Sequence, residues 1–360
     1  FTATTVCQGT PTSFTNTTND NGLTINLWHW DWGDTYSTSG QNPGTHSYSF
    51  SGDYSVTLSA QADNGCIDEI TKTVSVIGYP TAAVSADGAT TFCSGGSVTL
   101  TTPSNADFSY DWKRNGSSIT GANINSYLVQ ISGSYTIAVT NKGLCTTTSS
   151  SVPVVVNSAP SAPLINASGP LTFCQGESVD LSVTDITGNS YQWKLNGGAV
   201  GANSNTYSAT ASGTYSLVVT NSSNCSANSL NTVDVVVNPL PTIPTVNVSG
   251  PTEFCQGSSV ELSVASTGGY TYQWENNSTG ITGATNNSYL AQVSGNYILR
   301  VTNSYNCSSK TENVAITVAA SPSAPLISAD GSQIICQGDS VGLSITPTAG
   351  YNYQWKLNGG

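Results

Sequence analysis

Cysteine and tryptophan recur together along this chain at a fixed interval. Four cysteines, 81 residues apart, are each followed 19 residues later by a tryptophan. These pairs are Cys93 and Trp112, Cys174 and Trp193, Cys255 and Trp274, and Cys336 and Trp355. Two uncommon residue types that keep one period through four copies indicate tandem duplication of a unit of about 80 residues. An array of this kind repeats a structural unit, which disfavours a single catalytic centre.

The composition narrows the fold class and the possible partners. Only 8% of residues are charged and methionine is absent, while Ser, Thr, Asn and Gly fill most polar positions, so we expect strands and little helix. A net charge of -12 with eight Lys and Arg offers no basic stripe to nucleic acid and would be repelled by anionic lipid. The sequence also has no apolar run of roughly 18 residues, so no membrane insertion is predicted.

The nine cysteines indicate the compartment. None forms a C-x-x-C motif or a cluster with histidine, and the two histidines, His29 and His46, are too few to complete zinc sites. We therefore interpret the cysteines as a disulfide framework, which is typical of an oxidising, extracytoplasmic setting.

Proline-rich segments divide the chain into modules. They occupy Tyr79–Pro80, Asn157–Pro163, Asn238–Pro244 and Ala320–Pro325. Proline stiffens such segments into extended spacers. The predicted modules 1 to 5 are residues 1–78, 79–158, 159–240, 241–321 and 322–360, and we expect module 5 to be truncated because this sequence is a piece of a longer protein.

The segments between these joints have the pattern of β-strands. Apolar residues alternate with polar ones, as in Val179–Val183, which is typical of half-buried antiparallel strands. The sequence therefore predicts an all-β protein, a tandem array of antiparallel β-sandwiches that forms an elongated filament.

A longer pattern in Gly176–Asn221 identifies the type of sandwich. It reads G-x-x-V-x-L-x-V, then Y-x-W, then N-G, then G-x-Y-x-L-x-V-x-N, and it resembles an immunoglobulin-like (Ig-like) domain of the I-set. The resemblance implies that Trp193 packs on Val183 and Leu217, which stand where that family has its two core cysteines. Core tryptophans are implied at Trp112, Trp193, Trp274 and Trp355, and corner tyrosines at Tyr135, Tyr215 and Tyr297.

Module 1 has a different signature. Its Trp30-Asp31-Trp32-Gly33-Asp34, followed by H-x-Y and G-x-Y-x-V-x-L, resembles the PKD domain, a related β-sandwich. A PKD domain followed by Ig-like repeats with a Cys-x-Gly motif is similar to the giant cell-surface adhesins of gliding Bacteroidetes, which the type IX secretion system exports. This resemblance implies a cell-surface location, with the export and motility machinery as partners.

Two disulfide pairings fit the cysteine spacing, and both remain open. Pairing within modules joins Cys7 to Cys66, Cys93 to Cys145, Cys174 to Cys225, and Cys255 to Cys307. Pairing between neighbours joins Cys7 to Cys145, Cys93 to Cys225, and Cys174 to Cys307. The second set leaves three cysteines to bond outside this sequence, namely Cys66, Cys255 and Cys336.

The Ig-like resemblance favours pairing between neighbours. Strands B and F of such a sandwich run in the same direction, and Cys174 precedes the centre of strand B whereas Cys225 follows the centre of strand F. At about 3.3 Å per residue the two would lie at opposite ends of the module. Bonded cysteines need Cα atoms within about 7 Å. A curled segment or a long hairpin would still permit pairing within modules.

Candidate binding residues are confined to module 1. Trp28, Trp30 and Trp32 form either an exposed face for sugar rings or a packed strand. Asp31 and Asp34 are weak candidates for calcium, since carboxylate oxygens are its usual ligands, but hydrogen bonds to backbone are the simpler expectation. We expect His46 to satisfy hydrogen bonds within the sandwich.

No catalytic residues are predicted, because two histidines in one module do not supply a nucleophile with its base. We expect no cofactor except possible calcium, and the neighbouring repeats and possible glycans as partners. The predicted function is a stalk of a large secreted cell-surface adhesin for attachment and gliding. The alternative is a spacer or glycan-binding region of a large secreted enzyme that degrades polysaccharide or protein.

Overall fold

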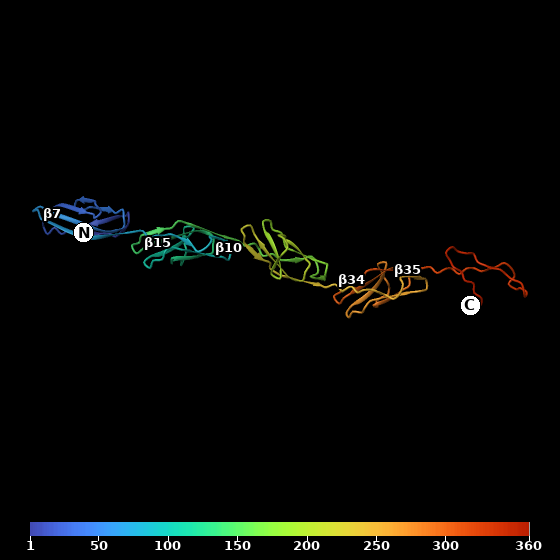
Figure 1. The fold of residues 1–360 in the computed structure, drawn as a ribbon. Coiled ribbons are helices and arrows are strands. Elements are labelled where there is room, and N and C mark those ends of the chain that lie inside the picture. Colours follow the sequence, from blue (N-terminus) through green and yellow to red (C-terminus); the bar gives the residue numbers. More distant parts are fainter. Residues whose placement is uncertain (360) are drawn as a thin grey trace.

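The chain forms a row of β-sandwich modules. In a computed structural model, which describes residues 1–359, the modules follow one another in sequence order and the two termini lie at opposite ends (Figure 1). Every regular element within these residues is a strand, so the all-β prediction is confirmed. Across the same residues no helix is present that could span a membrane.

Module 1 is a sandwich of a three-stranded and a five-stranded sheet. Its strands are β1 (Thr2–Ala3), β2 (Val6–Cys7), β3 (Pro11–Thr15), β4 (Ile25–Asp31), β5 (Ser37–Ser39), β6 (Thr45–Ser47), β7 (Gly52–Ala62) and β8 (Ile67–Ile77). The sheets have the orders β1-β3-β6 and β2-β8-β7-β4-β5. The first segment of the chain therefore contributes β1 to one sheet and β2 to the other, where β2 runs parallel to β8.

Modules 2, 3 and 4 share one topology. The strands of module 2 are β9 (Ser85–Ala86), β10 (Thr91–Cys93), β11 (Val98–Thr101), β12 (Ser109–Arg114), β13 (Ser117–Ser118), β14 (Ser126–Val129), β15 (Gly133–Thr140), β16 (Thr146–Thr148) and β17 (Val152–Asn157). Strand β9 belongs to the sheet β14-β11-β9, whereas β10 belongs to the sheet β10-β17-β15-β12-β13, to which β16 adds beside β15.

The same order recurs in the next two modules. Module 3 contains β18 (Asn166–Ala167), β19 (Thr172–Cys174), β20 (Val179–Ser182), β21 (Ser190–Leu195), β22 (Gly198–Val200), β23 (Thr206–Ala209), β24 (Gly213–Thr220), β25 (Ser226–Asn228) and β26 (Val233–Asn238). Module 4 contains β27 (Asn247–Val248), β28 (Glu253–Cys255), β29 (Val260–Ser263), β30 (Thr271–Asn276), β31 (Thr279–Gly280), β32 (Ser288–Ala291), β33 (Gly295–Thr302), β34 (Ser308–Lys310) and β35 (Val314–Ala319).

Each of these cores is built around one tryptophan. Trp112, Trp193 and Trp274 have no exposed surface, and each indole Nε1 donates to a backbone carbonyl, at 3.0 Å to Ile124, 2.9 Å to Ser204 and 3.2 Å to Asn286. In module 3 the cluster includes Leu217 and Val183, although Val183 lies just after the end of β20. The fully buried Leu181 is the more central residue of that strand.

A tyrosine braces each of these modules at the start of its longest strand. The hydroxyls of Tyr135, Tyr215 and Tyr297 donate to backbone carbonyls four residues earlier, at 2.8, 2.9 and 2.9 Å. Burial raises the pKa of all three phenols, so each stays protonated and remains a donor. This is the corner arrangement of Ig-like sandwiches.

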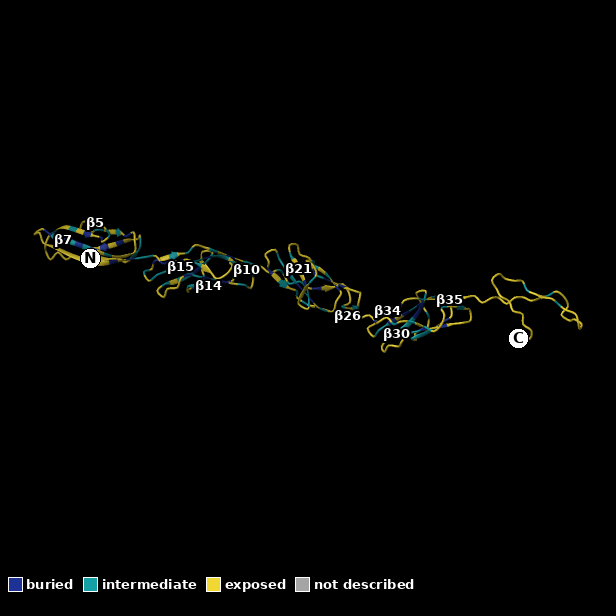
Figure 2. Ribbon diagram, viewed as in Figure 1, coloured by how far each residue is buried: buried dark blue, intermediate teal, exposed yellow. Residues whose placement is uncertain are grey.

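Residues 322–359 form no comparable core. Their strands are β36 (Ser328–Ala329) and β37 (Leu343–Ser344), which pair only with each other. The chain there is open and largely exposed (Figure 2). Trp355 is 49% exposed, so the expectation that it marks a core is wrong for this structure, because no second sheet covers it within the described residues.

Module 4 carries a cluster of three charged side chains on the outer face of its larger sheet, of which only the glutamate is buried. The Glu275 side chain is 3% exposed, and its carboxylate accepts from Arg300 at 2.7 Å and from Lys310 at 2.8 Å. Burial acts to raise the pKa of Glu275, but the hydrogen bonds from Lys310 and Arg300 outweigh it and hold the pKa below its usual value. In modules 2 and 3 the residue after the core tryptophan is a lysine, Lys113 or Lys194.

We predict that Glu275→Gln destabilises module 4 by about 2 kcal/mol, the typical cost of losing hydrogen bonds to charged groups. Because the pKa of Glu275 is depressed on folding, its contribution is complete above the pKa of the unfolded state, near 4.3, and is lost as pH falls below that value. Calorimetric unfolding of the full chain between pH 3 and 7 measures both effects. Lys194→Gln in module 3 is the matched control, for which a change within about 0.5 kcal/mol is expected. An unchanged pH dependence in Glu275→Gln would contradict the assignment.

Candidate functional site

The feature that distinguishes this array is a disulfide across each joint between complete modules. Cys7 bonds Cys145, Cys93 bonds Cys225, and Cys174 bonds Cys307, with Cα–Cα distances of 5.7, 5.6 and 5.6 Å. These are the three pairs preferred in the sequence analysis. The pairs within modules do not form, because the two cysteines of one module lie at its opposite ends, as the parallel strand pairs described next make clear.

The first cysteine of each joint is placed by a parallel strand pair. Strands β2, β10 and β19 run beside the last strand of their own module, and their final residues Cys7, Cys93 and Cys174 lie opposite Ile77, Asn157 and Asn238. The last strand ends where the chain leaves the module. A cysteine in register with that end therefore lies at the pole that faces the next module.

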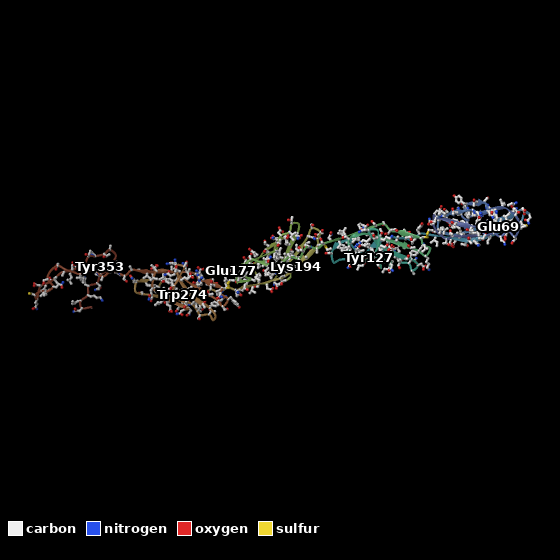
Figure 3. All side chains as sticks on the ribbon, turned by 180° about the vertical axis from the view of Figure 1, so that it is seen from behind. Glu69, Tyr127, Glu177, Lys194, Trp274 and Tyr353 are labelled. Carbon is white, nitrogen blue, oxygen red and sulfur yellow. A yellow bond between two sulfur atoms is a disulfide. The ribbon has the colours of Figure 1, made fainter. Side chains whose placement is uncertain are left out.

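A Cys-x-Gly turn then reverses the chain after each of these cysteines. The glycines after these three cysteines are Gly9, Gly95 and Gly176, with φ of 77°, 91° and 96°. Gly257 and Gly338 repeat the turn after Cys255 and Cys336, with φ of 97° and 102°. Residues with a Cβ rarely adopt such φ values. In module 3 the Glu177 carboxylate accepts from the amide of Cys174 at 3.1 Å. Glu177 lies at the junction of modules 3 and 4 (Figure 3).

The second cysteine closes a short loop at the opposite pole of the following module. We call these loops joint loops; they are residues 141–145, 221–225 and 303–307, each between the long strand and the short strand beside it. In the first, the Asn141 amide donates to the Cys145 carbonyl at 3.1 Å and the Leu144 amide donates to the Asn141 carbonyl at 3.0 Å. Cys145, Cys225 and Cys307 are at most 1% exposed, so the bonds are shielded from solvent on that side.

The asparagine that opens each joint loop was missed by the sequence analysis. Asn221 Nδ2 donates to the Ser158 carbonyl of the preceding linker at 2.8 Å, while its Oδ1 accepts from the Cys225 amide at 3.0 Å. The same donation joins Asn141 to Gly78 at 2.7 Å and Asn303 to Pro239 at 2.8 Å. The available signal was the motif N-x-x-x-C, which occurs once in each of modules 2, 3 and 4.

Packing at the joint varies from one copy to the next. We number the joints by the module that precedes them, so that joint 1 lies between modules 1 and 2. At joint 1 the Ile77 side chain fills the space beside Gly143, and a Cβ on Gly143 would collide with it. The corresponding pairs are Asn157 with Ser223 at joint 2, and Asn238 with Tyr305 at joint 3. Ile77, the last residue of β8, thus faces a glycine at joint 1, whereas that glycine is replaced by Ser223 at joint 2 and by Tyr305 at joint 3. The packing surfaces of the three joints therefore differ, although each joint has the same disulfide.

Cys66, Cys255 and Cys336 are unpaired and exposed among the described residues. Cys66 ends a loop with the same backbone pattern as the joint loops, since the Ala62 amide donates to the Cys66 carbonyl and the Gly65 amide donates to the Ala62 carbonyl, both at 2.9 Å. Cys255 ends β28, which runs parallel to β35. Bonds from these three cysteines to partners outside this sequence stay a prediction.

Of the two alternatives for the tryptophans of module 1, an exposed face for sugar rings and a packed strand, the structure shows the packed strand. Trp30 has no exposed surface, Trp32 is 3% exposed, and Trp28 packs against the same core. The rings of Trp30 and Trp32 stack with centroids 5.6 Å apart. They lie inside because Trp30 and Trp32 point from β4 and its end toward the opposite sheet, where Phe14 contacts both rings.

The acidic residues proposed for calcium make hydrogen bonds within module 1. Asp31 Oδ1 accepts from the Gly33 amide at 2.8 Å. Asp34 Oδ2 lies 2.8 Å from His46 Nε2, and the His46 ring stacks on Trp32 at 4.9 Å. Residues 1–359 contain no group of three or more His, Cys, Asp or Glu side chains arranged to hold a metal. This geometry provides Asp31 and Asp34 with protein partners, so it lends calcium binding no support.

We predict that Asn221→Ala loosens joint 2. Ser223 and Cys225 each donate an amide to the Asn221 carboxamide at 3.0 Å, and loss of one such bond costs about 1 kcal/mol. Amide hydrogen exchange at Ser223 and Cys225 of the full chain should therefore accelerate by roughly fivefold. The control is Asn228→Ala, which alters an exposed asparagine of β25. If the exchange rates of Ser223 and Cys225 are the same in Asn221→Ala and Asn228→Ala, Asn221 does not stabilise the joint loop.

We predict that Leu144→Asn stabilises module 2. Leu144 has φ of 59° and is 82% exposed, whereas the same position is Asn224 in module 3 and Asn306 in module 4, with φ of 59° and 63°. The left-handed conformation costs a residue such as leucine about 1 kcal/mol more than asparagine. Calorimetry of the full chain should show that gain, and an equal loss in the reciprocal variant Asn224→Leu. A loss of stability in Leu144→Asn, or a gain in Asn224→Leu, would refute the explanation.

Two sequence-family profiles match the chain. The PKD domain profile matches residues 1–77, and the profile described as Ig-like domain, CHU_C associated, matches residues 160–239. No curated protein sequence matches the chain. The profile ranges fall on module 1 and module 3, and modules 2 and 4 repeat the topology of module 3.

Several solved multidomain structures are similar to the array. Titin domains I67–I69 are 15% identical, cover 67% of this chain and 100% of theirs, and have a TM-score of 0.32. The Ca²⁺-stabilised adhesin that helps an Antarctic bacterium bind ice is 15% identical, covers 87% of this chain and 96% of its own, and has a TM-score of 0.30. Domains 3–5 of Drosophila OTK are 16% identical, cover 64% and 93%, and have a TM-score of 0.25.

Likeness at this level carries no statement about function. The family profiles and the three disulfides together indicate a secreted or extracellular protein. Residues 1–77 thus match a PKD domain and residues 160–239 match an Ig-like domain, and the tandem β-sandwiches that contain them indicate structural or adhesin-like extracellular modules.

Proposed function

We propose that this array is a stiff stalk of a large cell-surface adhesin, which holds an adhesive region away from the cell. The observation that supports it is the disulfide across each of three successive joints. Modules joined by a linker alone move independently by default. A second covalent connection at each joint has no use in a string of independent binding domains, but it is what a rod requires.

The physical argument concerns bending at the joints. The linker and the disulfide attach neighbouring modules at two points, and two fixed points remove most rotations that one point allows. The asparagine of the joint loop adds a third contact, between its amide and the linker carbonyl. Bending then requires distortion of packed groups rather than rotation about a free backbone.

The surface of the array suits a passive extracellular role. It carries few charges and a net charge of -12, which keeps chains apart without attracting nucleic acid. His46, one of two histidines in the sequence, is paired with Asp34. The His46 ring also stacks on Trp32 at 4.9 Å, and we infer that the pair is structural and the region non-catalytic.

The finer setting rests on resemblance. The Cys-x-Gly repeats behind a PKD domain resemble the gliding adhesins described above, which supports export by a type IX system, anchorage at the cell surface, and the motility machinery as a partner. Glycans on an encountered surface are candidate ligands of the whole adhesin. They would bind outside the buried tryptophans of module 1.

We predict that the length of the array depends on the three joint disulfides. Small-angle X-ray scattering of the oxidised chain should give the maximum dimension of a straight rod. The variant Cys145→Ser/Cys225→Ser/Cys307→Ser should show a smaller radius of gyration and a broader distance distribution, because its joints bend.

The matched control replaces the unpaired cysteines, as Cys66→Ser/Cys255→Ser/Cys336→Ser, and should scatter as the unchanged chain does. Far-ultraviolet circular dichroism checks that each variant keeps its strands. If the variant without joint disulfides is as extended as the unchanged chain, stiffness does not come from these bonds and the stalk proposal loses its support.

A further inference from the structure

The three disulfides overlap along the sequence, and this overlap changes how the chain is connected. They close the spans 7–145, 93–225 and 174–307. Every backbone position between Cys7 and Cys307 lies inside at least one span. Each of the three linkers lies inside one span only, whereas the interiors of modules 2 and 3 lie inside two.

The shortest covalent route through the array therefore leaves out most of the strands of each module. It runs from Cys7 across to Cys145, along the chain to Cys174, and across to Cys307. The middle stretch consists of β16, β17, the second linker, β18 and β19, which are extended already. A second route runs along the first linker to Cys93, across to Cys225, and onward through β26.

Within module 2 the two routes lie side by side. Strand β10 ends the stretch from the first linker to Cys93, and β17 belongs to the stretch that begins at Cys145. They are hydrogen-bonded in parallel, with Thr91 opposite Val155 and Cys93 opposite Asn157. Both strands would be pulled in the same direction by the same two neighbours, so tension does not slide one strand past the other.

We propose that the disulfides make this array a redundant covalent tether, in which tension passes through paired strands and bypasses most of each sandwich. From Cys145 to Cys174 there are 29 residues, 174 minus 145, with a fully extended length of about 100 Å. From Cys7 to Cys307 along the backbone there are 300, 307 minus 7, or about 1,000 Å. Unfolding of a core then lengthens the tether hardly at all, and one cut in the backbone between Cys7 and Cys307 leaves the tether whole.

This inference goes beyond the proposed stalk role and depends only on which cysteines are joined. A flexible array with the same bonds would still have a low limit of extension. The scattering experiment above and the cleavage experiment below can therefore fail separately.

The test is cleavage at one chosen linker. A recognition sequence for a site-specific protease is inserted after Ser161 in the full chain, at a point that only the Cys93–Cys225 bond spans. After cleavage, a non-reducing gel should show one species of full mass, and a reducing gel should show two fragments. Pairing within modules would instead release two fragments without reductant, and that result would overturn the proposal.

The variant Cys93→Ser/Cys225→Ser supplies the control. Cleaved after Ser161, it should separate without reductant. Cleaved at the same sequence placed after Thr81, which the Cys7–Cys145 bond spans, it should stay in one piece. This second result shows that the variant still folds and forms its other bonds, so separation after Ser161 cannot be attributed to general misfolding.

Single-molecule extension gives an independent readout. A module of about 80 residues that unfolds in an unbonded chain adds roughly 270 Å of contour length. Pulled from its two ends in oxidising buffer, the array should show no step of that size, and such steps should appear after a reductant is added. Full-module steps in the oxidised chain would refute the bypass.

Discussion

The parallel pairing of a short early strand with the last strand of each module is the constraint on which this architecture depends. Because β10 is parallel to β17 and ends in register with it, Cys93 is carried to the pole where the chain leaves module 2. The same pairing places Cys7 and Cys174. An antiparallel partner would end at the other pole, and the cysteine would then face the module behind it.

Core and joint are built by separate sets of residues. Trp193 and Tyr215 hold the two sheets of module 3 together, in a core cluster that contains no cysteine. Cys174 and Cys225 lie outside that core cluster, at opposite poles of the same module. An Ig-like sandwich usually uses its cysteines to link its own sheets. Here apolar packing does that work, which leaves the cysteines available to link modules.

The three joints share the same bonds but differ in the packing of the side chains around them. Every joint has a disulfide, a Cys-x-Gly turn and an asparagine that donates to the linker, yet the facing side chains range from Gly143 to Tyr305. The disulfide and the asparagine hydrogen bond connect the two modules at each joint, while the side chains packed around these bonds determine the local shape of the joint. Each joint can thus take its own angle without changing the covalent path along the rod.

The fold class and the repeat could be predicted without a structure, because strand alternation and the 81-residue spacing of Cys and Trp are properties of local sequence. The Ig-like resemblance added that the two cysteines of a module lie at its opposite poles. The sequence left the disulfide partners open, since residues 93 and 225 become neighbours only when two folded modules dock end to end. The role of Asn221 was hidden for the same reason, because its partner carbonyl belongs to another module. Burial of Trp30 and Trp32, and exposure of Trp355, were likewise decided by whether an opposing sheet covers them, which only tertiary structure can supply.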